Sequence, residues 1–158
     1  MKKSTVVVIY NQEGQILLLK RGKDHKMFPG EWCFPGGKLD WVSEVVQSYV
    51  VNPLNDTAYT QETINNRWEE YAECVVRECF EETGIRLISF FDVGDWLSDS
   101  EFLVKVFHSH TIEEPTVVFP NREHYEWGWF HLDELPNGVG RMTMEQIEKE
   151  MIRKEHVL

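Results

Sequence analysis

Three glutamates lie within residues 77–85 at a spacing that could hold a divalent cation. Residues three and four apart are neighbours on a helix, so a helical Glu78 would face both Glu81 and Glu82. Three carboxylates this close repel one another unless a cation lies between them. Their hard oxygen atoms suit Mg²⁺ or Mn²⁺. The alternative interpretation is that they form the ordinary solvated face of an amphipathic helix.

Two further stretches place this cluster in a longer motif. Arg77 lies one turn before Glu81, and Glu69 precedes Arg77 by two turns. Upstream, residues 32–40 have the sequence Trp-Cys-Phe-Pro-Gly-Gly-Lys-Leu-Asp. Together these residues resemble the box of the Nudix (MutT-like) hydrolase family, in which a glycine turn and a glutamate precede Arg-Glu-apolar-x-Glu-Glu-x-Gly-apolar. The matching residues of the second half are Glu69, Arg77, Glu78, Cys79, Glu81, Glu82, Gly84 and Ile85.

The chain departs from the family pattern between the glycine turn and the helix. The family has five residues between its glycine and its first glutamate, whereas thirty-one residues separate Gly37 from Glu69 here. Glu44 is too distant from the Arg-Glu segment to be the missing glutamate. The simplest alignment keeps Asp40 and Glu69 in the motif and treats residues 41–66 as an insertion.

The resemblance implies a fold, a cofactor and roles for the box residues. The implied fold is α/β, a Nudix-type α/β/α sandwich with a mixed β-sheet, in one domain over residues 1–158. Arg77 would orient Glu78 or Glu81, and Glu69 would support Arg77 or a metal-bound water. The implied ligands of Mg²⁺, or of Mn²⁺, are the carbonyl of Gly37 and the carboxylates of Glu78, Glu81 and Glu82.

The general base stays open between the helix carboxylates and a later loop. Residues 121–136 look like the family's segment after the box. Glu126 is the first candidate there for an additional metal ligand or base, and Glu123 is the second. His124 could protonate a leaving phosphate. For each of these side chains, the alternative is an exposed loop residue without a catalytic role.

Substrate contacts are expected from cations and aromatic rings near the glycine turn. Lys38 adjoins the turn and is favoured for phosphate binding, with Arg21 as a second cation. Trp32, Phe28 and Trp127 could stack on a base, because aromatic faces hold any base. The alternative for these three rings is packing in the core. His108 and His110 supply too few ligands for a metal and are interpreted as structural or exposed.

The composition indicates one globular domain. An apolar fraction of 42% with 13% aromatic residues argues against disorder. A formal net charge of −11 argues against a general nucleic-acid-binding surface, although bound Mg²⁺ could still attract phosphates. Cys33, Cys74 and Cys79 lack metal-finger spacing and are expected to be reduced thiols. The apolar run at residues 6–9 is too short for a signal peptide or membrane span, so we expect a cytoplasmic protein without a membrane partner.

The hydrophobic pattern predicts strands and two helices that would position these residues. One helix should begin near Asn66, bury Ala72, Val75, Val76 and Cys79, and end at Gly84. A second should begin at the capping box of residues 143–146. Its expected apolar stripe is Met144, Ile147, Met151 and Ile152. The expected strands cover residues 5–10, 16–19, 32–34, 87–92, 102–108, 116–119 and 127–131.

The insertion has a helical pattern of its own, which ends before Asn52-Pro53. Its apolar stripe could pack beside the active site, against a second subunit in a homodimer, or on its own domain. The residues of this stripe are Val42, Val45, Val46, Tyr49 and Val50.

The motif predicts a Mg²⁺-dependent pyrophosphohydrolase acting on a nucleoside diphosphate linked to another moiety. The expected substrate is a nucleoside triphosphate, oxidised forms included, cut to monophosphate and pyrophosphate. A nucleotide-sugar or ADP-ribose hydrolase is the alternative enzyme. A Nudix-fold sensor that binds a nucleotide without cutting it is the alternative from another class, although such modules usually lose a metal glutamate.

Overall fold

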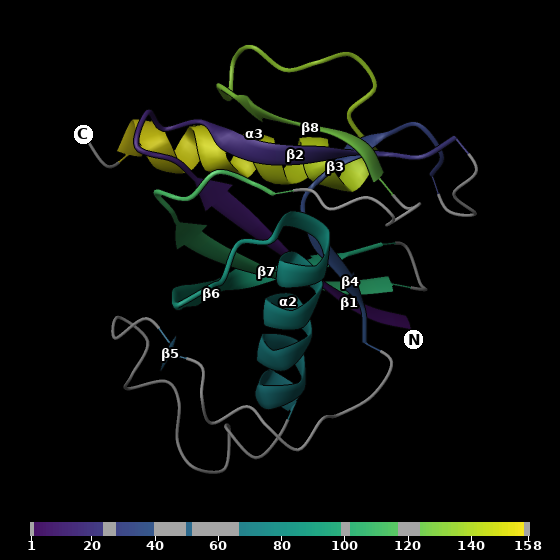
Figure 1. The fold of residues 1–158 in the computed structure, drawn as a ribbon, viewed down its shortest axis with the longest axis vertical. Coiled ribbons are helices and arrows are strands. Elements are labelled where there is room, and N and C mark those ends of the chain that lie inside the picture. Colours follow the sequence, from purple (N-terminus) through teal and green to yellow (C-terminus); the bar gives the residue numbers. More distant parts are fainter. Residues whose placement is uncertain are drawn as a thin grey trace.

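One mixed sheet lies between two helices in the computed structural model, which describes residues 2–23, 28–39, 50–51, 67–98, 102–116 and 124–156 (Figure 1). The strand order is β3-β2-β1-β7-β6-β5, with β4 also paired to β1 and β8 to β2. The pairs β1–β7 and β5–β6 are parallel and the others antiparallel. The predicted α/β class with a mixed sheet is confirmed. The elements are β1 Lys2–Tyr10, β2 Ile16–Arg21, β3 Trp32–Cys33, β4 Gly36–Lys38, β5 Val50–Val51, α2 Arg67–Thr83, β6 Ser89–Leu97, β7 Phe102–His110, β8 His124–Phe130 and α3 Arg141–His156.

The first two strands, both predicted, form a hairpin, and local bonds at Asn11 determine its turn. The Oδ1 atom of Asn11 accepts the backbone N–H groups of Glu13 and Gln15 at 3.0 and 2.9 Å. Gly14 takes a positive φ of 76°, which a residue without Cβ adopts at little cost.

No described helix is both long and apolar enough to cross a bilayer.

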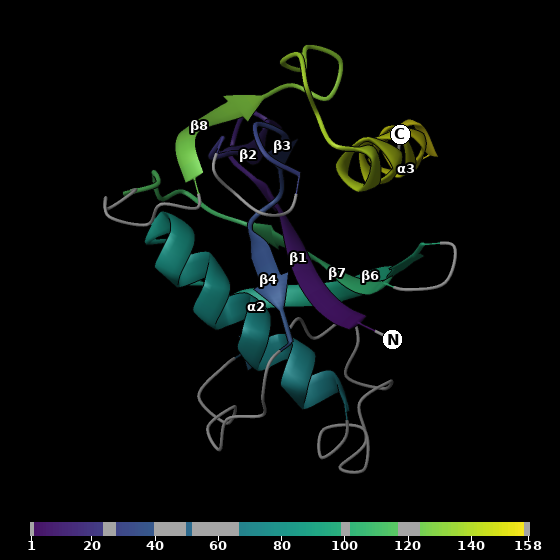
Figure 2. The same ribbon diagram turned by 90° about the vertical axis from the view of Figure 1, so that its right-hand side faces the viewer.

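The two faces of the sheet belong to two separate cores, with α2 over one face and α3 over the other (Figure 2). Side chains alternate between the faces along a strand. Leu17 and Leu19 pack in the cluster formed with α2, whereas Ile16 and Leu18 pack in the cluster that includes Ile147 of α3. The face of any paired residue on β2, β3 or β8 therefore follows from its register.

Helix α2 has the predicted apolar stripe and the predicted end. Gly84 has a φ of 75°, and its N–H donates to the carbonyl of Phe80 at 2.9 Å. Thr83 Oγ1 accepts the N–H of Ile85 at 3.0 Å, which holds the chain as it leaves the helix. The expected N-cap, Asn66, lies outside the described residues. The stripe residues Ala72, Val75, Val76 and Cys79 are all in the α2-side core.

Helix α3 begins earlier than predicted. Its first residue is Arg141, so Thr143 lies inside the helix instead of capping it. Contacts with β3 determine this start: Trp32 donates to the carbonyl of Gly138 at 2.9 Å and accepts the N–H of Gly140 at 3.1 Å. The capping-box prediction was wrong because this long-range contact, rather than a local cap, ends the preceding loop.

The buried face of α3 also differs from the prediction. Met151 and Ile152 are 38% and 56% exposed, so the expected apolar stripe is wrong at its C-terminal end. The sheet opposite this helix presents polar side chains, and Glu150 at 2% exposure is buried against them. Its neighbours from α3 that are also buried are Thr143, Gln146 and Ile147.

One helix prediction and one strand prediction need correction. Val50 was expected to continue the helical pattern of the insertion, but it pairs in parallel with Ser89 as part of β5. The remainder of the insertion, 41–49 and 52–66, lies outside the described residues. Thr116 was expected in a strand, but it lies in a loop and donates its N–H to the carbonyl of Thr83 at 2.7 Å.

Candidate active site

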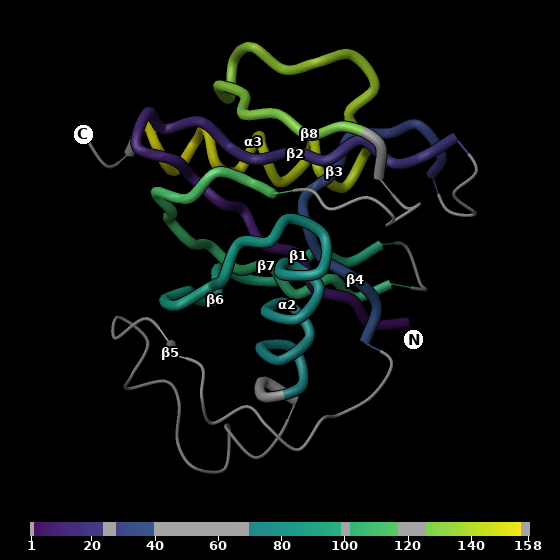
Figure 3. Tube along the Cα trace, in the orientation of Figure 1, coloured from purple at the N-terminus to yellow at the C-terminus, as the bar shows by residue number. Residues whose placement is uncertain are grey.

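Helix α2 runs past strand β4, which is formed by the glycine turn (Figure 3). Glu82 Oε1 accepts the backbone N–H of Gly36 at 2.8 Å. Glu78, one turn earlier, lies so close to Gly37 that a Cβ there would be 2.5 Å from Glu78 Cδ. Gly37 must therefore lack a side chain for Glu78 to occupy its position. The fold thus brings together Gly37, Glu78 and Glu82, as the motif predicted.

The three helix carboxylates differ in their exposure. Glu82 is 4% exposed, the side chain of Glu78 is 19% exposed, and Glu81 lies on the exposed surface. Burying an ionised carboxylate is costly unless it is paired or hydrogen-bonded. Glu78 and Glu82 therefore form the inner part of the site, and Glu81 lies at its outer edge.

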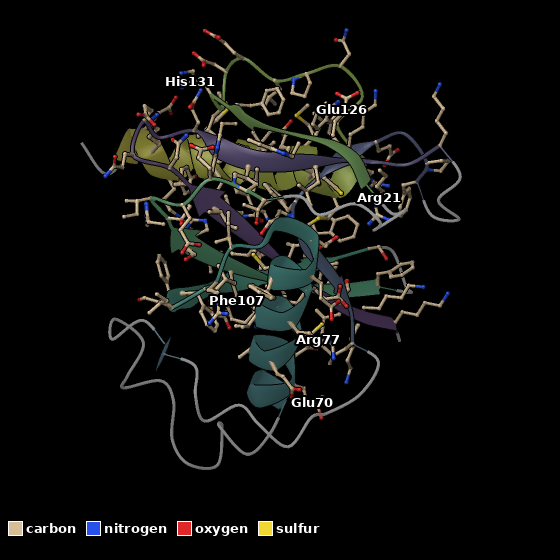
Figure 4. All side chains as sticks on the ribbon, viewed as in Figure 1. Arg21, Glu70, Arg77, Phe107, Glu126 and His131 are labelled. Carbon is tan, nitrogen blue, oxygen red and sulfur yellow. The ribbon has the colours of Figure 1, made fainter. Side chains whose placement is uncertain are left out.

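Arg77 lies beside the inner carboxylates, on α2 as Figure 4 shows. Its Nη2 atom is 3.5 Å from Glu78 Oε1. Burial lowers the pKa of Arg77, but the neighbouring Cys74, Glu78 and Glu81 outweigh this effect and raise the pKa above its ordinary value. A guanidinium that stays charged can hold the Glu78 carboxylate in one orientation.

The donor atoms at this site are those that a hard cation requires. In the described part of the chain, no three His, Cys, Asp or Glu side chains form a group that could hold a metal ion. Glu81 lies on the exposed surface next to Glu82, and its part as a third carboxylate ligand stays a prediction. Mg²⁺, however, commonly uses one or two carboxylates and takes its remaining ligands from water and substrate phosphate. Glu78, Glu82 and the adjacent Gly37 carbonyl fit that requirement.

Arg21 lies at the end of β2, on the sheet face that α2 covers (Figure 4). On this strand it follows the same alternation as Leu17 and Leu19. Burial raises the pKa of the Cys33 thiol to about 11, with Arg21 opposing and Glu82 adding to that rise. The Arg21 guanidinium and the Glu82 carboxylate therefore both lie near Cys33. A fixed positive charge thus stands close to the acidic end of α2, as a phosphate-binding residue would.

Lys38, the other predicted phosphate-binding cation, is the last residue of β4 and is exposed. It pairs with Ser4 of β1 and directly follows Gly37. The structure therefore keeps Lys38 next to the glycine turn, with its side chain in solvent.

Trp32 and Glu126 lie on the opposite face of the sheet from the glutamates. Both pair with Lys20, whose side chain shares a face with Ile16 and Leu18. Trp32 is 8% exposed and meets the Phe130 ring edge-on at 5.2 Å between centroids. Its placement matches core packing, the alternative to base stacking. Glu126 is exposed and is not brought to the α2 carboxylates by this register.

Trp127 is the aromatic candidate that the register places on the α2 face. It pairs with Leu19 and is 37% exposed. Phe28 is 55% exposed, with a positive φ of 52°. Trp127 is therefore better placed than Trp32 to contact a base held near α2.

Several predicted residues lie outside what the structure describes. These are Asp40, Glu123 and the insertion other than β5, together with the side chains of Glu69 and His124. Glu69 itself is within α2, two turns before Arg77, as the motif requires.

Gly36 and Cys74 contact the site but were not singled out for it from the sequence. Gly36 supplies the amide that holds Glu82. The Cys74 thiol donates toward the carbonyls of Gly37 and Lys38, at 3.7 and 3.4 Å from Sγ. The available signal for Cys74 was its position one turn before Glu78, on the same side of the helix.

Comparisons with known proteins agree with this geometry. The family model described as NUDIX domain matches residues 1–154. Among proteins with curated descriptions, none matches this chain.

Several solved structures share the fold. A MutT NUDIX hydrolase from Burkholderia pseudomallei is 28% identical, with a TM-score of 0.65 over 93% of this chain and 95% of that one. A NUDIX hydrolase from Alicyclobacillus acidocaldarius is 16% identical, with a TM-score of 0.72 over 94% and 90%. A MutT protein from Methanosarcina mazei Go1 is 21% identical, with a TM-score of 0.66 over 98% and 94%.

Proposed function

The chain belongs to the Nudix family of hydrolases, which act on nucleoside diphosphate-linked substrates, and we propose that it cuts a nucleoside triphosphate to a monophosphate and pyrophosphate. Oxidised nucleoside triphosphates are included in this proposal. The reaction would depend on Mg²⁺, for which Mn²⁺ could substitute.

One observation carries the proposal: Glu78 and Glu82 meet Gly36 and Gly37 across α2 and β4. The two carboxylates and the Gly37 carbonyl would hold the metal ion. When bound, the ion would neutralise the phosphate oxygens and lower the pKa of a bound water. The bond of Glu82 to the Gly36 amide and the contact of Glu78 with Gly37 support this role, because they would hold both carboxylates ready for the ion.

The remaining residues would act on the substrate and on the attacking water. Arg77 would orient Glu78, from which it lies 3.5 Å away. Arg21 and Lys38 would hold the phosphates that are not attacked. This hydrolysis needs no covalent nucleophile, so water attacks phosphorus directly. Glu78 or Glu81 would accept the proton of that water.

A phosphate-release screen of the purified full chain tests the proposal. Nucleoside triphosphates, their oxidised forms, nucleotide sugars and ADP-ribose would each be offered with Mg²⁺, Mn²⁺ or EDTA. We expect metal-dependent release of pyrophosphate from at least one triphosphate, with no activity in EDTA. Turnover confined to nucleotide sugars or ADP-ribose would contradict the triphosphate assignment.

A catalytic glutamate variant is the control for contaminating hydrolases. Activity that persists unchanged in Glu78→Gln would not belong to this site. If the metal-loaded protein binds nucleotides but cuts none of them, it acts as a nucleotide sensor instead.

A further inference from the structure

We propose that Cys74 is a positioning residue of the metal site, whose thiol holds the carbonyls of the glycine turn in register with the helix carboxylates. This inference rests on the proposed function, because it concerns the same metal site. It assigns a role to a buried thiol that the hydrolytic reaction does not itself use.

The contacts between α2 and β4 follow one regular pattern. Three α2 residues, each one turn apart, meet successive residues of β4. Glu82 accepts the N–H of Gly36 at 2.8 Å, and Glu78 lies against Gly37. Cys74 Sγ completes the series, at 3.4 Å from the Lys38 carbonyl oxygen and 3.7 Å from the Gly37 carbonyl oxygen.

The hydrogen bonds of Glu82 and Cys74 to β4 run in opposite directions. The carboxylate of Glu82 accepts a bond from a backbone amide, whereas the thiol of Cys74 donates to backbone carbonyls. The two contacts therefore fix a backbone amide before Gly37 and a backbone carbonyl after it to one helix. Gly37 lies between them, and its carbonyl is the proposed backbone ligand of the metal ion.

Cys74 is buried at this position, with 4% of its surface exposed. Its Sγ atom also lies 4.0 Å from Arg77 Nη2. A small residue is required there, because β4 runs directly past the helix. The ladder with β1 holds one edge of β4, and the Cys74 thiol adds a donor from the helix. Partners of this kind, one step removed from a metal, orient its ligands and tune its affinity.

Cys79 provides a matched comparison on the same helix. It is fully buried, but it belongs to the α2-side core, and its thiol contacts Thr83 Oγ1 at 3.6 Å. Removing either sulfur shortens a buried side chain on α2 by the same atom. Only the Cys74 change should alter the metal site.

The test is Mn²⁺ binding to the full chain without substrate. Binding is measured as the loss of the paramagnetic resonance signal of the free ion. We expect Cys74→Ala to weaken Mn²⁺ binding by about threefold to tenfold, the lower part of the range for partners of metal ligands, because a thiol is a weak donor. Cys74→Ser keeps a donor and should bind Mn²⁺ within about twofold of wild type. Cys79→Ala should leave Mn²⁺ affinity unchanged while lowering the thermal midpoint.

Equal weakening in Cys74→Ala and Cys79→Ala would overturn the proposal, as would wild-type Mn²⁺ affinity in Cys74→Ala. If Cys74→Ala does not fold, Cys74→Val replaces it, since valine fills the volume without a donor. A wild-type chain that binds no Mn²⁺ would overturn both the positioning role and the metal site. A chain that binds Mn²⁺ but hydrolyses no nucleotide would reject the proposed function alone, because this test needs no turnover.

Discussion

Each of the two helices presents buried glutamate side chains to the sheet, but the two sets have different surroundings. On the α2 side, Glu78 and Glu82 lie one turn apart against the backbone of a glycine turn. On the α3 side, Glu150 alone is surrounded by side-chain donors. These are Tyr10 at 2.6 Å, His108 at 2.5 Å and Gln146 at 2.7 Å.

The α3 cluster continues from Glu150 through His108 to Arg153. Arg153 Nη1 lies 3.4 Å from His108 Nδ1. Arginine has donors only, so Nδ1 must accept, which assigns the proton of a neutral His108 to Nε2, facing Glu150. One carboxylate here meets several donors from β1, β7 and α3. The cluster therefore joins three elements.

The comparison suggests what distinguishes a site from a structural cluster with similar residues. On the α2 side, three glutamates within two turns are accompanied by two arginines, Arg77 of the same helix and Arg21 of β2. This excess negative charge favours a cation. On the α3 side, the donors match the single carboxylate, so no ion is required. Four changes in the chain, and one in pH, would break or sharpen this distinction.

The largest effect is expected for Glu78→Gln. The amide keeps the shape of the side chain but removes the charge that would hold the metal ion. We expect turnover to fall by more than about a hundredfold, beyond the range seen for partners one step removed from a metal. The measurement is kcat across Mg²⁺ concentrations, with Glu70→Gln on the same helix as the control. Comparable losses in both variants would show that general helix charge, not this site, is being tested.

Gly37→Ala should impair activity more than stability. The new Cβ would lie 2.5 Å from Glu78 Cδ, and a flexible side chain can move away from it. Displacing a ligand by about 1 Å can cost on the order of a hundredfold in rate. Gly36→Ala is the contrasting variant, because its Cβ would lie 2.0 Å from the backbone oxygen of Thr5. That variant should lose stability as well, measured as a lower urea midpoint.

Glu150→Gln should show the reverse pattern. It removes the charge from a buried cluster and replaces one acceptor oxygen with an NH₂ group, so one donor loses its acceptor. The expected cost is about 2 kcal/mol in unfolding free energy. Turnover per folded molecule should stay within about twofold of wild type, because this glutamate is on the other side of the sheet. Urea unfolding measures the free energy of unfolding, and kcat per folded molecule measures turnover. Loss of turnover without loss of stability would contradict a structural role for this cluster.

The acid dependence of stability should come partly from the same residue. Burial raises the pKa of Glu150, but its contacts with His108, Tyr10 and Gln146 outweigh burial and hold the pKa below its ordinary value of 4.5. Such a group stabilises the fold above its unfolded pKa, and the stabilisation is lost as pH falls through the lower folded value. Wild-type unfolding free energy should therefore fall below about pH 4.5, and Glu150→Gln should flatten that part of the curve. Identical acid slopes in the two proteins would count against this origin.

Glu126→Gln should have the smallest effect. Its register with Lys20 places it on the sheet face opposite α2. We expect kcat and the Mg²⁺ midpoint to stay within about twofold of wild type, as for surface changes away from a site. A large change in the Mg²⁺ midpoint would instead bring this strand into the metal site.

Local sequence was sufficient for the elements whose bonds are local. The turn at Asn11 and the end of α2 at Gly84 depend on contacts within a few residues, and the strands around the first and the position of the second were predicted. The carboxylate spacing on α2 is of the same kind. The start of α3 at Arg141 was not predictable in this way, because it depends on contacts with Trp32 far earlier in the chain.

The candidate site was predictable in part. Glu78, Glu82 and Gly37 follow from the motif, and the structure brings them together. Whether Trp32 and Glu126 share a face with them depends on strand register, where a shift of one residue reverses the side. Pairing across β2 decides that register, and the sequence of β3 or β8 alone does not reveal it.

By itself, the sequence determined the family, the acidic helix and the kind of ion that its oxygen atoms suit. These properties follow from residue types and from spacings of three and four residues. The local geometry of a helix places residues at those spacings side by side. The tertiary structure decided which turn meets that helix, and how Cys74 comes to lie against Lys38. It also decided that the polar face of α3 packs against Tyr10 and His108, because contacts between distant segments depend on topology and register.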